Sequence, residues 1–390
     1  MAVLLWVLFL FYQIYNLISW TFGKIFIFII YKELQHSPIL HDVSEWNAQP
    51  WYSTGGTRAK KYLQGPDGKY YYFKRSQFKP GKDYRFEFWS EIIASKIGRP
   101  LGLNVLNYDI AIDGEVMGCI SKSMIDPDKE ELIEGIKYLQ AYDNTFNPEN
   151  VKQRNVYTFQ LIEKALKQFN LGAFLRDIIE IIVFDAIIGN SDRHQENWAL
   201  INEYTVVSKS LTMVEKEVRE KGFEKLPKFI KRIYKRFVDQ EKNQFNFEGT
   251  KAKLTFHKPK SASPIYDNGS SLGRELTESK VTQLLQNQKE LNIYINRGTS
   301  EIHWENAKLD HFSLIKKILD SSHGEVARDV LRRVLYLYDE TKIATIVNGI
   351  DNLVPESLSY YKLPDDRKQL IIKMITLRVE KLKELGNERI

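Results

Sequence analysis

One polar stretch constrains this chain more than any other, the run Ile-Gly-Asn-Ser-Asp-Arg-His-Gln-Glu-Asn-Trp at 188–198. It follows an apolar run over 178–188 that predicts a buried helix, and it precedes a short apolar segment at 199–201 that predicts a strand. Within it, Asp192 and Asn197 lie five positions apart. A carboxylate can accept the proton of a hydroxyl group, and an amide oxygen can bind magnesium. Because Gly, Asn, Ser and Asp are also ordinary turn formers, this loop alone does not decide between chemistry and a plain turn.

A second feature lies downstream, in the sequence Tyr-Asp-Asn-Gly at 266–269. Asp267 sits there in a turn-prone segment after a short apolar approach. In kinases a metal-binding Asp follows the catalytic loop in this order, and the spacing from Asp192 to Asn197 is that of the base and the metal ligand within such a loop. The two features together therefore favour phosphoryl-transfer chemistry.

The Asn-x-Asp-Arg-His-x-x-Asn loop at 190–197 and the later Tyr-Asp at 266–267 resemble the HipA-like family of Ser/Thr kinases, over about residues 53–340. Phosphoinositide kinases share the Asp-Arg-His-x-x-Asn order and are the alternative. The resemblance implies an α+β, two-lobed protein-kinase-like fold with a small β-rich N-lobe and a helical C-lobe. It also implies ATP and Mg²⁺ as cofactors and transfer of the γ-phosphate to a Ser or Thr hydroxyl of a protein.

The resemblance further implies roles for individual residues. Asp192 would be the base, while Asn197 and Asp267 would bind the metal and, through it, the nucleotide. Arg193 and His194 match the family order, and both would brace the loop and Asp267. The Phe of the kinase Asp-Phe-Gly motif is replaced by Asn268, so regulation through the packing of that ring is not expected.

A glycine pair upstream is a candidate phosphate-covering loop. Gly55 and Gly56 could expose backbone N–H groups to phosphate oxygens, although the segment lacks the G-x-G-x-x-G pattern and a plain turn is the alternative. The neighbouring hydroxyl residues Ser53, Thr54 and Thr57 lie where relatives of the HipA-like family can autophosphorylate.

A lysine and a helical glutamate complete the candidate site. Lys74 ends the second strand of a hairpin whose tip is the sequence Gly-Pro-Asp-Gly at 65–68. Helical periodicity over 84–97 places Glu91 on an apolar face, where a carboxylate needs a cationic partner. We therefore expect Lys74 to bind phosphate and Glu91 to orient the lysine. Glu87, one turn earlier, is the alternative partner of Lys74.

The remaining periodicity predicts further strands and helices. The turn Asp113-Gly114 joins two strands over 105–112 and 115–123, which lead to a hinge near 124–127. Helices are expected over 129–142, 157–169 and 171–188, and again between 309 and 385. A charged insertion over 208–253 contains two amphipathic helical pieces, which are either a solvated elaboration or a membrane-surface element.

These patterns predict a domain order for the whole chain. A transmembrane anchor over 1–32 and a linker over 33–52 precede the catalytic domain. The N-lobe would span 53–126, the C-lobe 127–300, and a helical C-terminal subdomain 301–390.

The N-terminal segment predicts a single-pass membrane protein. Residues 2–23 carry no charged side chain, and a helix of about 20 residues spans a bilayer core, although a buried amphipathic helix is the alternative. Lys24 and Lys32 both follow the apolar segment, which predicts a cytoplasmic catalytic domain. Such an anchor is not a hallmark of HipA-like kinases, so a toxin-type cytoplasmic role is not expected.

Composition excludes several other classes of protein. With 43% hydrophobic and 27% charged residues, the chain is typical of globular proteins. Its net charge of +6 is not gathered into a basic stripe, so no nucleic-acid partner is expected. The single cysteine, Cys119, excludes an internal disulfide framework. Three hypotheses remain: a membrane-tethered protein kinase with an unknown protein substrate, a phosphoinositide-type lipid kinase, and an inactive kinase fold that serves as a binding module.

Overall fold

The protein is described from a computed structural model. The structure describes residues 37–49, 60–76, 78–79, 82–148, 156–210 and 251–387, together with four isolated residues between 210 and 251. The chain divides into two compact units. The first unit comprises Met1–Met124, Glu134–Ala199 and Ala262–Ile390, and the second comprises Ile125–Ile133 and Leu200–Ser261.

A six-stranded sheet forms the N-terminal part of the first unit, in the order β1-β7-β8-β4-β3-β2. β1 pairs with β7 in parallel and the other neighbours are antiparallel. The predicted hairpin turns are present, with Gly68 at φ +73° and Gly114 at φ +65°. The strands are β1 (Leu40–Asp42), β2 (Asn47–Ala48), β3 (Lys60–Gln64), β4 (Tyr70–Arg75), β7 (Tyr108–Asp113) and β8 (Val116–Lys122), and a separate ribbon is formed by β5 (Phe78–Lys79) and β6 (Lys82–Asp83).

Successive side chains of β4 point to opposite faces of the sheet, so a core residue and a candidate site residue lie next to each other in the sequence. Phe73 joins the hydrophobic cluster on one face of the sheet, so the next residue, Lys74, lies on the opposite face. Helix α2 (Glu87–Gly98) packs on β7 and β8, and every residue of this helix is buried. It is buried on all sides because C-terminal elements also contact it: Trp89 Nε1 donates a hydrogen bond to the Tyr361 carbonyl at 2.8 Å.

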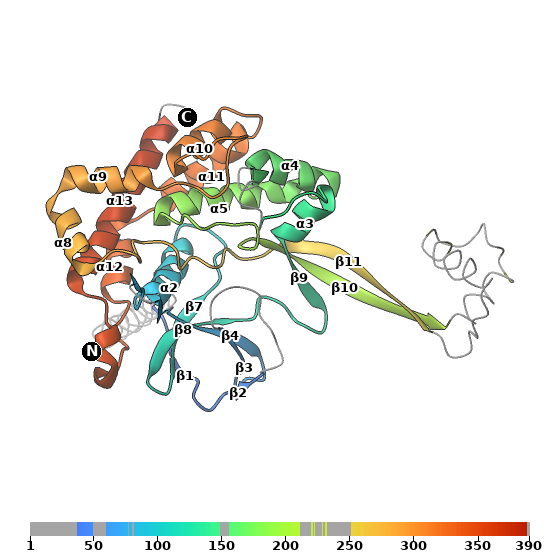
Figure 1. Ribbon diagram of the computed structural model, residues 1–390, viewed down its shortest axis with the longest axis horizontal. Coiled ribbons are helices and arrows are strands. Elements are labelled where there is room, and N and C mark those ends of the chain that lie inside the picture. The colour runs from blue at the N-terminus through green and yellow to red at the C-terminus, as the bar shows by residue number, and fades with distance from the viewer. Residues whose placement is uncertain are drawn as a thin grey trace, which may run out of the picture. The chain divides into compact units, whose positions relative to one another are not determined.

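The rest of the first unit is helical, as Figure 1 shows. The central helix is α5, which packs against α10, α11 and α13 and whose apolar residues are buried. The helices predicted over 157–169 and 171–188, and those predicted after residue 309, are confirmed. They are α3 (Gly135–Tyr142), α4 (Phe159–Gln168), η2 (Gly172–Phe174), α5 (Leu175–Ile188), α8 (Glu278–Gln286), α9 (Gln288–Arg297), α10 (His311–Leu319), α11 (Gly324–Leu337), α12 (Glu340–Asn348), η5 (Glu356–Tyr361) and α13 (Asp365–Asn387).

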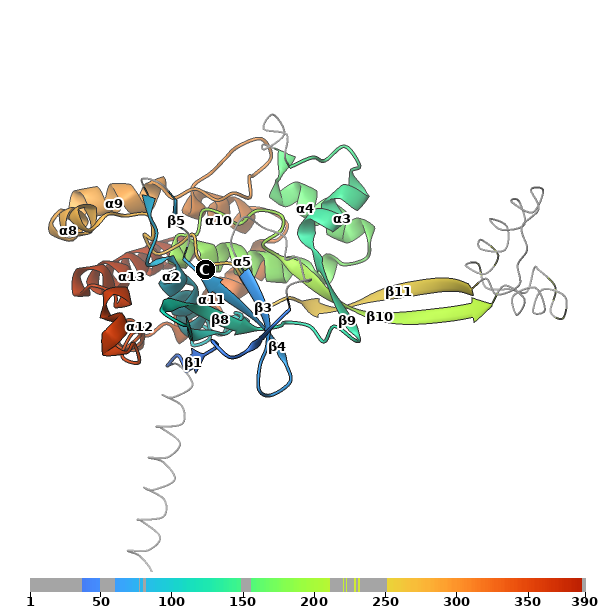
Figure 2. The same ribbon diagram turned by 60° about the horizontal axis from the view of Figure 1, so that its bottom comes forward.

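The second unit is built around a three-stranded sheet in the order β11-β10-β9. Its strands are β9 (Glu130–Glu134), β10 (Ala199–Ser210) and β11 (Lys251–Ala262). Figure 2 shows β10 and β11 as two long strands lying side by side. Lys260 on β11 pairs with Glu130 on β9 at 2.5 Å, so a salt bridge links the outer strands of the sheet.

This sheet differs from the sequence prediction in two places. The helix expected over 129–142 begins only at Gly135, because residues 130–134 pair as β9, and tertiary pairing overrides a weak helical preference. The strand expected over 199–201 continues to Ser210, into the predicted insertion. Nearly all of the two helical pieces predicted within 208–253 lies outside the described residues.

The predicted linker over 33–52 also contains structure. Residues 40–42 and 47–48 form β1 and β2, the two edge strands of the sheet. Between them Val43 is buried in the core cluster. Strands of two or three residues are too short to show an alternating pattern, which is why the sequence did not reveal them.

The predicted single-pass membrane location is corrected by the structure. Across the described ranges, no helix is both long and apolar enough to cross a membrane. The most apolar long helix, α5, has 14 residues, whereas a span needs about 20. The longest helix that the structure describes, α13, has 23 residues but carries charged side chains along its whole length. The predicted anchor over 1–32 itself lies outside the described residues.

Candidate active site

Lys74 is the centre of a buried cluster of polar groups. Its Nζ lies 3.1 Å from a carboxylate oxygen of Glu91 on α2, 3.1 Å from the Tyr108 hydroxyl on β7, and 3.1 Å from a carboxylate oxygen of Asp267. Burial alone would lower the pKa of Lys74, but the Asp267 and Glu91 carboxylates raise it well above its usual value. The lysine is therefore held as a cation, and it joins the sheet, α2 and the Asp267 segment.

Glu91 contacts the cluster through both of its carboxylate oxygens. The second oxygen accepts a hydrogen bond from the Asn268 backbone N–H at 2.7 Å. Glu87, the alternative partner for the lysine, instead pairs with Arg274, whose guanidinium also lies over the Tyr84 ring. The structure therefore brings Lys74 and Glu91 together, as the sequence predicted.

Asp267 has a constrained backbone. Its φ of +57° lies in the left-handed region, which an Asp adopts more readily than most residues. The next residue, Asn268, is fully buried and is held from two directions. Its backbone N–H donates a hydrogen bond to the Glu91 carboxylate, and its side-chain Oδ1 accepts a 2.7 Å hydrogen bond from Arg193. Asn268 thus fixes the backbone just after Asp267 by hydrogen bonds, where an Asp-Phe-Gly kinase has a ring.

Arg193 connects the two motifs. It is 1% exposed and makes a two-pronged contact with Asp185 of α5, at 3.0 and 2.7 Å. It also donates to the carbonyl oxygens of Tyr266 at 2.5 Å and Asn197 at 3.0 Å. Burial opposes the charge of Arg193, but the Asp185 carboxylate raises its pKa. The bracing role expected of Arg193 therefore has a direct geometric basis.

The loop that carries Asp192 is ordered by its own hydrogen bonds. α5 ends at Ile188 and is capped by Gly189, at φ +66°. The Asn190 side chain then donates to the Asp185 carboxylate and accepts from the Asp192 N–H. His194 contributes through its backbone, donating to the Asp192 carbonyl at 3.0 Å and accepting from the Asn197 N–H at 2.9 Å. No contact between the His194 ring and Asp267 is found in the described part of the chain, so of the two predicted braces only Arg193 reaches that segment.

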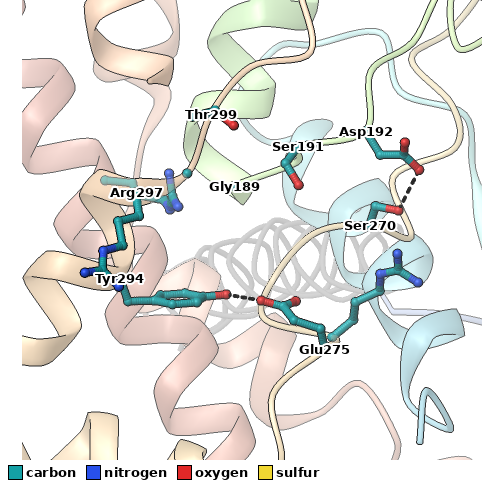
Figure 3. A pocket seen from close by; sticks show the side chains of 11 residues that line it. Gly189, Ser191, Asp192, Ser270, Glu275, Tyr294, Arg297 and Thr299 are labelled. Atoms are coloured by element: carbon teal, nitrogen blue, oxygen red, sulfur yellow. Dashed lines mark hydrogen bonds between the residues drawn. The ribbon is translucent and has the colours of Figure 1, made fainter. Parts of the chain in front are cut away.

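Asp192 and Asn197 point their functional groups in defined directions. The Asn197 Nδ2 donates to the Asp192 carbonyl at 2.7 Å, which leaves the amide oxygen directed away from that bond. The Asp192 side chain accepts a 3.0 Å hydrogen bond from the Ser270 hydroxyl (Figure 3). A carboxylate held by a hydroxyl in this way is oriented and remains able to accept a proton.

A pocket of about 600 Å³ adjoins Asp192. Figure 3 shows Asp192 and Ser270 on one side and Tyr294 and Arg297 on the other. The complete lining is Gly189, Ser191, Asp192, Ser270, Arg274, Glu275, Tyr294, Arg297, Gly298, Thr299 and Arg378. A reacting hydroxyl could therefore approach Asp192 from this pocket.

Some predicted site residues cannot be placed. Gly55 and Gly56, and the hydroxyl residues Ser53, Thr54 and Thr57, lie outside the described residues. The glycine loop and the autophosphorylation sites remain predictions from the sequence.

The described residues suit a nucleotide-bound magnesium ion better than a metal held by protein alone. No group of three or more His, Cys, Asp and Glu side chains that could hold a metal occurs among them. Magnesium typically binds one or two protein oxygens together with phosphates. A carboxylate at Asp267, an amide oxygen at Asn197 and a cation at Lys74 match that requirement.

Three residues that contribute to the site were not predicted from the sequence. Tyr108 lies in an apolar strand and has the pattern of a core residue, and its burial raises the pKa of its hydroxyl. Asp185 interrupts the apolar run 178–188, and this buried carboxylate within a hydrophobic helix was the available signal. Ser270 follows a turn and has no pattern that distinguishes it.

The fold and this cluster define a kinase-like domain: a mixed α+β chain with an N-terminal sheet, a helical C-terminal part, and a lysine, glutamate and aspartate joined between them. Comparison with known proteins agrees with this class. No protein-family description matches the chain, and no curated protein matches its sequence.

Among solved structures, the proinflammatory kinase CtkA of Helicobacter pylori is similar, with a TM-score of 0.64 at 16% identity, covering 90% of this chain and 98% of CtkA. HipA of Shewanella oneidensis MR-1, solved with HipB and operator DNA, has a TM-score of 0.41 at 11% identity, covering 88% and 68% of the two chains. The Golgi casein kinase has a TM-score of 0.36 at 12% identity, covering 90% and 75%. The likeness to CtkA confirms the kinase-like fold that the HipA-like resemblance implied.

Proposed function

We propose that the protein is an ATP- and Mg²⁺-dependent kinase that phosphorylates a Ser or Thr hydroxyl of a protein substrate. The observation that carries the proposal is the Lys74 ammonium, which lies 3.1 Å from the carboxylates of both Glu91 and Asp267. In kinases a lysine held by a helix glutamate contacts the phosphates, and the nearby aspartate binds the metal.

Each residue then has a defined task. Lys74 neutralises phosphate oxygens, while Glu91 keeps the lysine in place. Asp267 and Asn197 supply the oxygens that hold Mg²⁺, and the ion, when bound, neutralises charge that develops on the phosphates. Asp192 accepts the proton of the acceptor hydroxyl, oriented by the hydrogen bond from Ser270.

The inactive-fold alternative is less well supported. A binding module has no need to bury a lysine with two carboxylates, because desolvating three charges is costly unless their geometry is used. Lys74 is 6% exposed and Glu91 1% exposed, and both retain their charged partners. This arrangement favours catalysis over simple binding.

Labelled ATP tests the proposal against the lipid-kinase alternative. The full chain is incubated with Mg²⁺ and γ-labelled ATP, in parallel with a mixed protein acceptor and with vesicles containing phosphatidylinositol. We expect label on Ser or Thr, identified by phosphoamino-acid analysis and by mass spectrometry. Label recovered only in lipid would replace the protein acceptor by a lipid one, and label in neither acceptor would reject the proposal.

A further inference from the structure

The pocket beside Asp192 is lined by more cationic than anionic side chains. Three arginines line it, Arg274, Arg297 and Arg378, against two carboxylates, Asp192 and Glu275. The lining therefore has one net positive charge. At about 600 Å³, its volume lies within the range of about 300–1,000 Å³ found for ligand sites.

Four of the five charged groups are already engaged. Asp192 accepts the hydrogen bond from Ser270, and Arg378 donates to backbone carbonyl oxygens. Arg274 pairs with Glu87, and Glu275 accepts a 2.7 Å hydrogen bond from the Tyr294 hydroxyl (Figure 3). Arg297, at the end of α9, is exposed, and within the described ranges it makes no ion pair. Arg297 is thus the cation of this pocket that can meet an incoming anion.

Arg378 is built into the wall of the pocket. It is 3% exposed, and its guanidinium donates to the carbonyl oxygens of Ala186 at 3.1 Å and Ile295 at 3.5 Å, with no carboxylate partner among the described residues. Burial lowers the pKa of Arg378 to about 10, so the guanidinium still carries its charge at neutral pH.

Two glycines make room for this guanidinium. A Cβ at Gly189 would lie 2.8 Å from Arg378, and one at Gly298 would lie 3.1 Å from it. Gly298 has φ −62°, a conformation that any residue adopts, so its backbone does not require a glycine. The missing side chain there serves the close approach of Arg378, which keeps a buried positive charge against the pocket.

We propose that this pocket is an acceptor subsite for a peptide that carries an anionic side chain, Glu, Asp or a phosphorylated Ser, next to the Ser or Thr that is phosphorylated. Arg297 contacts that anionic group, and Arg378 adds a favourable field behind it. The inference rests on the proposed function, because the acceptor hydroxyl must reach Asp192. It adds the class of substrate that this site selects.

The charge balance favours a peptide over a phosphorylated lipid headgroup. A headgroup with several phosphates would place several negative charges beside Asp192 and Glu275, against one net positive charge. A single acidic side chain matches that charge. The hydroxyl groups of Ser191, Tyr294 and Thr299, which also line the pocket, suit the hydrogen-bonding groups of a peptide.

Paired peptides test the inference. The full chain, with ATP and Mg²⁺, is given Ser peptides that differ only in a Glu, a Gln or a phosphoserine placed at each position near the acceptor. We expect kcat/KM to be about tenfold higher for the best Glu or phosphoserine peptide than for its Gln counterpart, the size of one charge-assisted contact. The two anionic arms distinguish carboxylate from phosphate recognition.

Arginine variants assign the preference to the pocket. Arg297→Gln should bring the Glu-to-Gln ratio close to one, and Arg297→Glu should favour a Lys-flanked peptide. The matched control Arg332→Gln changes an exposed arginine of α11 outside the pocket and should keep the ratio.

Four outcomes would overturn the inference. An equal rate for the Glu and Gln peptides would reject it while leaving the kinase activity in place. A preference that survives Arg297→Glu would reject the pocket as its origin. Transfer to phosphatidylinositol in phosphatidylcholine vesicles, but to no peptide, would reject the peptide class. A chain that transfers phosphate to no acceptor would reject the proposed function, and the inference with it.

Discussion

At the scale of single residues, the site depends on charges that are buried together. Lys74 and Glu91 would each be costly to bury alone, and the Lys74 ammonium stabilises the carboxylates of both Glu91 and Asp267. The sequence predicted these three residues because a lysine ends a strand, a glutamate lies on an apolar helical face, and an aspartate lies in a turn. It did not predict Tyr108, because an aromatic residue in a strand is most often part of the core.

Glu91 and Glu87, one helical turn apart, should respond differently to mutation. Glu91→Gln removes the charge that holds Lys74, so we expect phosphoryl transfer to fall about 10- to 100-fold, with the fold retained. Glu87→Gln leaves Arg274 without its buried partner, so we expect about 3 kcal/mol lower stability and near-normal turnover of the folded protein. Thermal unfolding and initial rates on both variants check this, and the reverse pattern would move the catalytic pairing to Glu87.

A buried histidine should make stability depend on pH. His311 is fully buried, and neither ring nitrogen has a hydrogen-bond partner among the described residues. Burial, with a smaller effect of Arg378, lowers its pKa from 6.5 to about 3. The unfolded chain therefore binds the proton more tightly than the folded chain, and stability falls as the pH drops from 6.5 towards 3.

At about 1.4 kcal/mol per pH unit, His311 should lower the free energy of unfolding by about 2 kcal/mol between pH 7 and pH 5. Denaturant unfolding at the two pH values, on the wild type and on His311→Leu, measures this effect. The variant should lose about 2 kcal/mol less than the wild type. Equal losses in the two proteins would show that the histidine is already protonated or accessible in the folded state.

At the scale of elements, the loop after α5 is positioned by the helix before it. Asp185, one turn before the helix ends, holds both Arg193 and Asn190, and through them the Asp192 backbone and Asn268. Local sequence predicted α5 and the loop because their apolar and turn patterns are strong. It did not predict β9 or the length of β10, because their stability depends on pairing with strands far away in the chain.

Replacement of Arg193 by lysine should damage this element despite keeping the charge. A lysine cannot reproduce the two-pronged contact with Asp185 while also reaching Tyr266 and Asn268. We expect Arg193→Lys to lower stability by about 3 kcal/mol and to reduce phosphoryl transfer further than the folded fraction explains. Chemical unfolding and rates on soluble protein test this, with Arg332→Lys as the exposed control. If Arg193→Lys matched Arg332→Lys in both stability and transfer rate, Arg193 would not be the residue that connects the Asp192 loop to the Asp267 segment.

At the scale of the whole molecule, the order of two short motifs predicted a kinase-like fold that overall sequence similarity could not reveal. The catalytic loop and the Tyr-Asp segment, 75 positions apart from Asp192 to Asp267, meet through Arg193 and Ser270. The predicted membrane location was wrong, because that prediction was argued from the hydropathy of one end of the chain. The roles of Gly55 and Gly56 remain predictions, since both residues lie outside the described ranges.

The central claim is that the cluster around Lys74 and the Asp192 loop transfer phosphate from ATP. Single-turnover transfer to a Ser peptide, measured beside nucleotide affinity, tests it most directly in Asp192→Ala, Asp267→Ala and the exposed control Glu384→Ala. Asp192→Ala should bind nucleotide normally and lose about 10²- to 10⁴-fold in rate, and Asp267→Ala should also lose Mg²⁺-dependent affinity. The control should match the wild type. Wild-type transfer rates in both aspartate variants would contradict the account.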